Sequence, residues 1–115
     1  SHHHEIRKIV MTTPLFEKDG FIICFEAHEE DISMRRHFIK ECGWSESEYR
    51  RIKNYEWFCA EVSAWKDGEK LGNDYLGCCC YKTAKDFYTA EGYFPDMVDR
   101  AIEEAKARNA PSPSP

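Results

Sequence analysis

Cysteine and histidine are the residues of this chain that could do the most specific chemistry. The sequence holds six cysteines and five histidines, of which His2–His4 have the form of a purification tag. Three cysteines are consecutive, Cys78–Cys80, and this run lacks the two-residue spacer that lets two thiolates converge on one zinc ion. We favour reduced, buried thiols, and we expect neither a metal site nor a cofactor. A zinc site would have to assemble in space from Cys24, His28, Cys78 and Cys80.

A thiol can also act as a nucleophile when an imidazole lies beside it and a third group orients that imidazole. The residue types for such a site are present in Cys24, Glu26, His28 and His37. His28, however, lies four residues beyond Cys24, which in an extended chain places it about 13 Å away. The short motifs of serine hydrolases, P-loop nucleotide binders, dinucleotide-binding folds and zinc proteases are absent from the sequence. We therefore favour a protein that is not an enzyme, and a Cys-His enzyme with its pair formed between elements is the third choice.

The stretch from Tyr55 to Lys82 predicts two β-strands joined by a type I′ turn at Asp67–Gly68. Unbroken pairing from that turn would mix apolar and polar residues on each face of the hairpin. One extra residue at Gly72 corrects the pattern and places Ala60 opposite Leu76, so we predict a β-bulge at this glycine. One face would then hold Phe58, Ala60, Val62, Ala64, Leu76, Cys78 and Cys80, and the other would hold Trp57, Cys59, Glu61, Trp65, Tyr75, Cys79 and Tyr81.

Large rings on the second face distinguish this hairpin, because an antiparallel sheet usually turns one face to water. Four such rings together approach about 600–1,000 Å², more than the roughly 300–600 Å² of the largest patch on a typical monomer. Either an N-terminal segment or Phe87–Tyr88 covers them, or a partner protein or a second copy of the chain binds them. We favour protein binding, and base stacking is disfavoured because no Lys or Arg is interleaved on that face. The rings are those of Trp57, Trp65, Tyr75 and Tyr81.

Basic residues concentrate between residues 35 and 53, on two expected short helices. If these side chains form one surface, they would bind an anion such as a nucleotide or nucleic-acid phosphate. The whole chain carries a net charge of −5, whereas general nucleic-acid binders are more basic. A nucleic-acid or nucleotide-binding module is therefore the alternative to protein binding. Its candidate contacts are Arg35, Arg36, Arg50 and Arg51.

The elements that would position these residues form an α+β fold. A first strand is predicted over Phe21–Ala27 after the Asp19–Gly20 turn, and a helix begins near Ser33 and ends at Gly43. A capping box at Ser45–Glu48 begins a second, short helix, the hairpin follows, and a last helix carries an apolar stripe. The predicted order is β-α-α-β-β-α, a two-layer sandwich of a three-stranded antiparallel sheet and helices. The stripe comprises Met97, Val98, Ala101, Ile102 and Ala105.

The composition is that of one folded domain, because 42% of the residues are hydrophobic and 14% are aromatic. We expect residues 1–10 to be a tag and leader, residues 11–108 to be the domain, and residues 109–115 to be a disordered Pro/Ser tail. No stretch of the sequence is long and apolar enough for a membrane helix, so we expect no membrane partner. Unpaired cysteines indicate a reducing cytoplasm.

Four segments of the chain resemble a family of small, uncharacterised proteins of phages and prophages. These segments are Trp57–Val62, Asp74–Tyr81, Asp86–Phe87 and Gly92–Val98, and they resemble the family's patterns W-C-x-V, YLG(C/G)C-x-Y, DF and YY-x-DMV. Phe94 departs from the last pattern, where a tyrosine is common. The resemblance spans roughly residues 21–105 and implies an accessory protein of a mobile element in the cytoplasm of a bacterial host. By analogy with other small acidic phage proteins, it implies binding and inhibition of a host protein.

Overall fold

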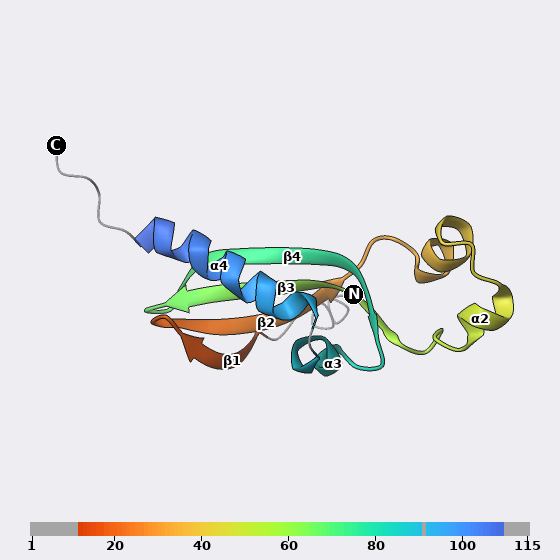
Figure 1. The fold of residues 1–115 in the computed structure, drawn as a ribbon, viewed down its shortest axis with the longest axis horizontal. Coiled ribbons are helices and arrows are strands. Elements are labelled where there is room, and N and C mark those ends of the chain that lie inside the picture. The colour runs from red at the N-terminus through yellow and green to blue at the C-terminus, as the bar shows by residue number, and fades with distance from the viewer. Residues whose placement is uncertain (1–11, 91, 110–115) are drawn as a thin grey trace, which may run out of the picture.

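The computed structural model describes residues 12–90 and 92–109 and is built on one antiparallel sheet (Figure 1). Each strand pairs with its neighbours along the chain, so the four strands form a meander. The strands are β1 (Thr13–Lys18), β2 (Phe21–Glu29), β3 (Glu56–Lys66) and β4 (Glu69–Tyr81). The predicted α+β class is confirmed, but the predicted three strands are corrected to four, because β1 adds an edge strand before the first predicted one.

Two tight turns join the strands at the same end of the sheet. Asp19 and Gly20 connect β1 to β2 with φ angles of 55° and 86°, and Asp67 and Gly68 connect β3 to β4 with 52° and 78°. Positive φ at both central residues is the mark of a type I′ turn, whose twist suits a hairpin. The type I′ turn predicted at Asp67–Gly68 is therefore confirmed.

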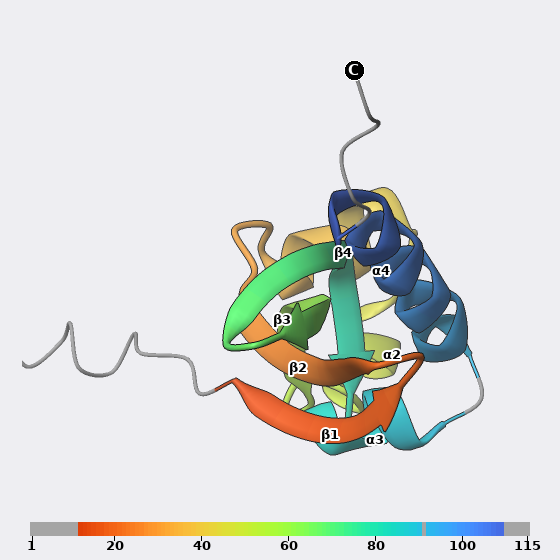
Figure 2. The same cartoon turned by 90° about the vertical axis from the view of Figure 1, so that its left-hand side faces the viewer.

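Two helices cover one face of the curled sheet (Figure 2). The long helix α4 (Tyr93–Asn109) crosses β3 and β4, and the short helix α3 (Ala84–Thr89) inserts the buried ring of Phe87 beside it. All five residues of the predicted apolar stripe of α4 are buried, as expected. The helix continues through Asn109, one residue beyond the predicted domain limit, and the predicted leader and the rest of the tail lie outside the described residues.

Gly72 permits the close approach of α4 to β4. A Cβ atom at this position would lie 2.1 Å from the carbonyl oxygen of Ala101 and 2.7 Å from the amide nitrogen of Ala105. Ala101 and Ala105 are themselves fully buried, so small residues on both elements bring the two backbones together. This close contact with the helix backbone is what requires a glycine at position 72.

Between β2 and β3 the chain forms a lobe beyond the end of the sheet (Figure 1). It contains η1 (Arg36–Glu41) and α2 (Glu46–Arg50), neither of which buries a residue fully. The capping box of Ser45 and Glu48 is formed as predicted, and Gly43 follows η1 with a φ of 75°. The first predicted α-helix is instead mostly π-helical, and the observed order is β-β-π-α-β-β-α-α.

Candidate functional site

The pairing of β3 with β4 decides which side chains share a face. Ala60 lies opposite Leu76, as predicted. The register shifts once near the turn, where Trp65 pairs with Lys70 and Ala64 pairs with Gly72. The extra residue is therefore Leu71, and the predicted bulge lies one residue earlier than expected.

A second shift that was not predicted reverses the faces at the end of β4. Cys78 adopts a φ of 56°, and Phe58 pairs with Cys79 instead of Cys78. A shift of one residue turns every later side chain to the opposite face. The ring of Tyr81 consequently lies on the helix-covered side, 5.4 Å from Phe87 and 6.2 Å from Phe58 between ring centroids.

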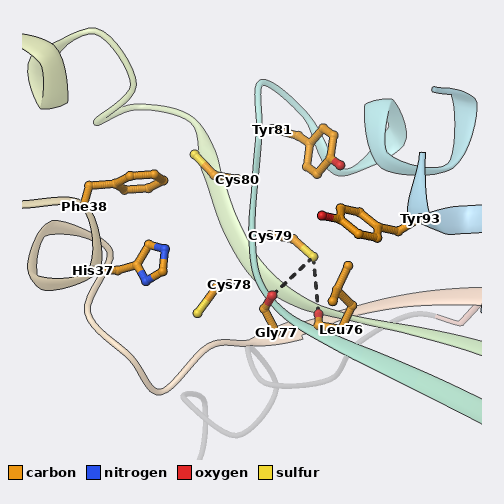
Figure 3. A pocket seen from close by; sticks show the side chains of 9 residues that line it. All are labelled: His37, Phe38, Leu76, Gly77, Cys78, Cys79, Cys80, Tyr81 and Tyr93. Carbon is orange, nitrogen blue, oxygen red and sulfur yellow. Dashed lines mark hydrogen bonds between the residues drawn. The ribbon is translucent and has the colours of Figure 1, made fainter. Parts of the chain in front are cut away.

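Two predictions about faces are therefore wrong. Tyr81 does not share a surface with Trp57, Trp65 and Tyr75, because the second shift turns it toward the core. For the same reason, the cysteines of β4 lie on the faces opposite to those predicted. Figure 3 shows their side chains around a cavity of about 290 Å³ at this end of β4. Cys79 and Tyr81 point to the side of Tyr93, whereas Cys78 and Cys80 point toward His37 and Phe38.

The sheet face opposite α4 holds the remaining predicted rings, and we call it the open face. Cross-strand pairs assign its members, since Ile22 lies opposite Trp65, and Glu26, Glu61 and Tyr75 lie side by side on β2, β3 and β4. Its other members on these strands include Cys24, His28, Cys59, Ser63, Lys70 and Asn73.

Glu61 lies at the centre of the open face and is almost fully buried, with 1% of its surface exposed. Its carboxylate accepts hydrogen bonds from His28 Nε2 at 2.7 Å, Lys70 Nζ at 2.8 Å and Asn73 Nδ2 at 2.8 Å. Burial alone would raise the pKa of this carboxyl, but the hydrogen bonds from Lys70, Asn73 and His28 outweigh it and lower the pKa to about 2. Glu61 is therefore a carboxylate at neutral pH, with its charge balanced inside the chain.

Aromatic and aliphatic side chains surround this polar centre. Tyr75 is 56% exposed and Ile22 is 46% exposed. The indole of Trp65 is half-buried, donates to Ser63 Oγ at 2.8 Å and lies below the ammonium of Lys70. An apolar rim, exposed at Ile22 and Tyr75 and half-buried at Trp65, therefore borders a centre whose hydrogen bonds are made.

Trp57 belongs to the same face but is covered by the lobe. Its indole nitrogen donates to the carbonyl of Ile32 at 2.7 Å. Its ring centroid lies 5.3 Å from that of His37 and 5.7 Å from that of Phe38. Of the four predicted rings, only Trp65 and Tyr75 are therefore available together on the open face.

The N-terminal segment and Phe87–Tyr88 were the two parts of the chain proposed to cover the rings from within. The described aromatic side chains of both segments lie on the other face of the sheet. Phe16 packs edge-on against Phe94, and Phe87 and Tyr88 pack against Phe25, all on the helix-covered face. The remainder of the N-terminal segment, up to residue 11, lies outside the described residues.

The structure does not assemble the zinc ligands suggested by the sequence. Strand β3 lies between β2, which carries Cys24 and His28, and β4, which carries Cys78 and Cys80. All six cysteines are free thiols, and burial is the main cause that raises the pKa of Cys24. The imidazole of His28 is bonded to Glu61, so the pair of Cys24 with His28 is not formed.

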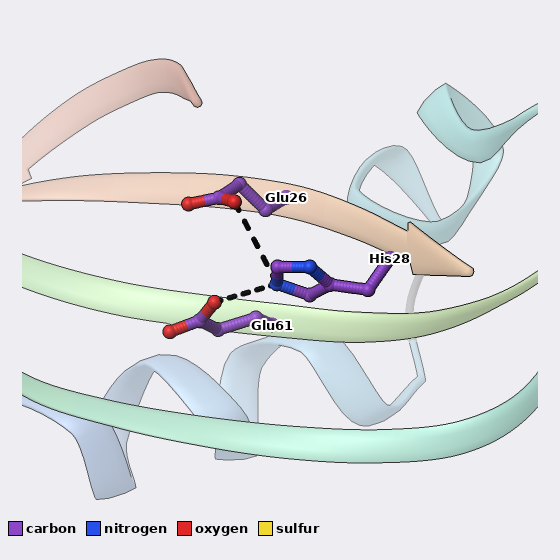
Figure 4. A group of neighbouring side chains, drawn as sticks. All are labelled: Glu26, His28 and Glu61. Atoms are coloured by element: carbon purple, nitrogen blue, oxygen red, sulfur yellow. Dashed lines mark hydrogen bonds and ion pairs between the residues drawn. The ribbon is translucent and has the colours of Figure 1, made fainter. Parts of the chain in front are cut away.

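One group that sequence reasoning did not find is a cluster of possible metal ligands. One nitrogen or oxygen atom from each of Glu26, His28 and Glu61 lies within 4.8 Å of the other two (Figure 4). Alternation along β2 places Glu26 and His28 on one face, which the sequence shows. Their register with Glu61 has no such signal, because residues 30–55 separate the two strands.

A thiol–imidazole contact was also missed. Cys42 Sγ lies 3.7 Å from His37 Nε2, and Glu41 Oε1 lies 3.5 Å from His37 Nδ1 without the alignment of a hydrogen bond. The i to i+5 spacing of His37 and Cys42 suits the wider π-helical turn, whereas the sequence predicted an α-helix.

The four candidate arginines all lie in the lobe, but acidic residues are interleaved with them. Arg35 is hydrogen-bonded to the carboxylate of Glu46 and lies near the ring of Tyr49. The pKa of Glu46 is lowered mainly by this hydrogen bond, with a smaller effect from Arg50. The side chains of all four are exposed: Arg35, Arg36, Arg50 and Arg51.

Within the described residues, none of the helices is long and apolar enough to cross a membrane. Comparisons of the chain with protein-family models, with curated proteins and with solved structures match nothing.

Proposed function

We propose that this protein acts by binding another protein through its open face. The observation that carries the proposal is an apolar rim beside the buried carboxylate of Glu61, formed by the exposed Ile22 and Tyr75 and the half-buried Trp65. Tryptophan and tyrosine are the residues most often found at the energetic centre of a protein interface. A sheet face with such residues offers a large contact area to a partner protein.

The polar centre suits an interface because its bonds are already made. A buried polar group costs free energy when binding removes its water without providing a new partner. Glu61 has three donors from its own chain, so a partner that covers it does not have to supply one. The binding free energy would then come from the apolar rim.

Charge favours a different protein over a second copy of this chain. Among the described residues, the open face carries the carboxylates of Glu17, Glu26 and Glu61 against the ammonium of Lys70, and the whole chain has a net charge of −5. Two copies joined by this face would bring like charges together. We therefore propose a partner with a basic surface that includes apolar side chains.

The biological setting is part of the same proposal. The resemblance to phage and prophage proteins supports an accessory protein that inhibits a host or defence protein in the bacterial cytoplasm. Six free cysteines are in keeping with a reducing compartment.

The test is a comparison of variants in a capture experiment from bacterial lysate. Ile22→Glu with Tyr75→Ala changes two exposed side chains of the open face, and Tyr93→Ala changes an equally exposed ring at the start of α4. We expect a captured protein that the wild type and Tyr93→Ala retain and that the open-face variant loses, although all three are folded by circular dichroism. Equal capture by all three, or a stable dimer of the wild type by light scattering, would overturn this assignment.

A further inference from the structure

The open face contains two adjacent carboxylates whose mutual repulsion a bound cation would relieve. Glu26 on β2 and Glu61 on β3 are directly paired across the strands. Like charges directly opposite each other in a sheet are destabilising. In this structure His28 lies between them, with its Nε2 atom 2.7 Å from Glu61 Oε1 and 3.6 Å from Glu26 Oε2 (Figure 4).

Each carboxylate has one oxygen held by donors and one turned toward His28. Thr12 Oγ1 donates to Glu26 Oε1 at 2.6 Å. Lys70 Nζ and Asn73 Nδ2 both donate to Glu61 Oε2 at 2.8 Å. Ligating carboxylates of metal sites are fixed in this manner, with outer groups bonding the oxygen that does not bind the metal.

We propose that Glu26, His28 and Glu61 form a binding site for a divalent transition-metal ion, with Zn²⁺ as the expected ion. In a tetrahedral zinc site with bonds of 2.0–2.1 Å, neighbouring ligand atoms lie about 3.3 Å apart. The observed separations of 2.7 Å and 3.6 Å bracket that value, so small rotations of the side chains open the site. The neutral imidazole would then bind the ion through Nε2 and carry its proton on Nδ1.

The donor set selects the class of ion. One imidazole with two carboxylates suits zinc and its neighbours in the first transition row, whereas Mg²⁺ and Ca²⁺ prefer sites made of oxygen alone. Glu61 is buried, but the side chain of His28 is 33% exposed, so a fourth coordination position faces solvent. The site is thus open, as in zinc sites with a water or an exchangeable ligand.

Lys70 limits the affinity of the site without blocking it. Its ammonium bonds Glu61 Oε2, the oxygen turned away from His28, and its positive charge offsets one of the two carboxylates. The ion would therefore meet a net charge of about −1 from these three groups, so we expect moderate affinity.

This proposal goes beyond protein binding, and it can be tested without a partner. The chain is first changed at His2, His3 and His4 to Ala, because those imidazoles would bind metal on their own. Zn²⁺ is then titrated calorimetrically under reducing conditions, and Co²⁺ is titrated by absorption. We expect one ion per chain and a cobalt spectrum without the thiolate-to-cobalt band that a cysteine ligand gives.

Matched variants distinguish this site from the others. His28→Gln and Glu26→Gln should each weaken binding at least about 100-fold. His37→Gln and Cys42→Ser, which change the thiol–imidazole contact of the lobe, should leave it unchanged. Absence of saturable binding, full binding by folded His28→Gln and Glu26→Gln, or a thiolate band lost in Cys42→Ser would each overturn the proposal. None of these results depends on whether the open face binds a protein.

Discussion

Glu61 shows how a buried carboxylate is kept charged inside a small sheet. Its two oxygens receive three donors from β2 and β4, the strands on either side of it. A charge without such donors would be too costly to bury, and the group would become protonated instead. The sequence placed Glu61 correctly on the second face but gave no sign of these donors, because they come from residues paired across strands.

Replacing Glu61 by glutamine tests this account at the residue scale. Glu61→Gln keeps the shape of the side chain but replaces one accepting carboxylate oxygen by an NH₂ group that faces the donor of Lys70 or His28. We therefore expect the free energy of unfolding to fall by about 2–3 kcal/mol. Urea denaturation measures the change. Glu103→Gln on the exposed side of α4 is the control and should change stability by less than about 0.5 kcal/mol. Equal stability of the two variants would show that the network contributes little.

Cys79 provides a second test, through its ionisation. Burial is the main cause that raises the pKa of this thiol from 9.0 to about 11. Below pH 9 the thiol is protonated in both states, but above it the unfolded chain releases the proton more readily than the folded chain. The free energy of unfolding should therefore fall between pH 9 and 11, by at most about 2–3 kcal/mol from this group.

The measurement compares urea unfolding at pH 8 and pH 10.5. Cys79→Ala should reduce the loss of stability at the higher pH, because it removes the titrating group. Cys42→Ser, which changes an exposed cysteine, should leave the loss as in the wild type. The same pH dependence in all three proteins would mean that other groups cause it.

At the scale of elements, the contact of β4 with α4 depends on the absence of a side chain at Gly72. Gly72→Ala would place a methyl group 2.1 Å from the carbonyl oxygen of Ala101, which belongs to a helix backbone and cannot turn aside. We expect α4 to shift and the free energy of unfolding to fall by about 1–3 kcal/mol. Gly92→Ala is the control, since nothing lies within 4 Å of the corresponding Cβ. Stability of Gly72→Ala equal to that of Gly92→Ala would contradict this packing.

The elements with a local signal were predicted, and those that depend on distant contacts were not. The stripe of α4, the capping box of α2 and the Asp67–Gly68 turn each follow from a few neighbouring residues, and each is observed. The edge strand β1 was missed because it is short and contains Pro14, which reads against a strand. Its type I′ turn at Asp19–Gly20 was the available signal.

The residues of the candidate site could likewise be predicted only where a local sequence signal was present. One bulge in β4 could be found because the apolar alternation failed without it. The second, at Gly77 and Cys78, was missed because three cysteines in succession carry no alternation. Gly77 was the signal for it, since a glycine inside a strand often marks an irregularity. That one residue moved Tyr81 away from the predicted contact surface.

At the scale of the whole molecule, the two candidate functions would use separate parts of the chain. The open face belongs to the sheet, and the four candidate arginines belong to the lobe between β2 and β3. The strands flanking the lobe are antiparallel neighbours that remain paired up to Glu29 and Phe58. A short turn could therefore join them directly, as in a hairpin.

Replacing residues 31–55 by a linker of about four Gly and Ser residues would separate the two functions. We expect the variant to fold with its sheet and α4 intact, at a cost of about 1–3 kcal/mol, because Trp57 loses its contacts with His37 and Phe38. Far-UV circular dichroism and cooperative unfolding in urea check this. An unfolded variant would show that the lobe is part of the structural core.

The same variant then decides between protein and nucleic-acid binding. Binding through the open face should persist without the lobe, because Ile22, Trp65 and Tyr75 lie on strands that the linker leaves unchanged. Binding of nucleic acid through the arginines should weaken steeply with salt in the wild type and be absent from the variant. That is the result the alternative function predicts. Our own expectation is that even the wild type gives no salt-dependent gel shift with nucleic acid, because Arg35 is already bonded to Glu46. A salt-dependent shift that disappears with the lobe would instead make the arginine surface the functional one.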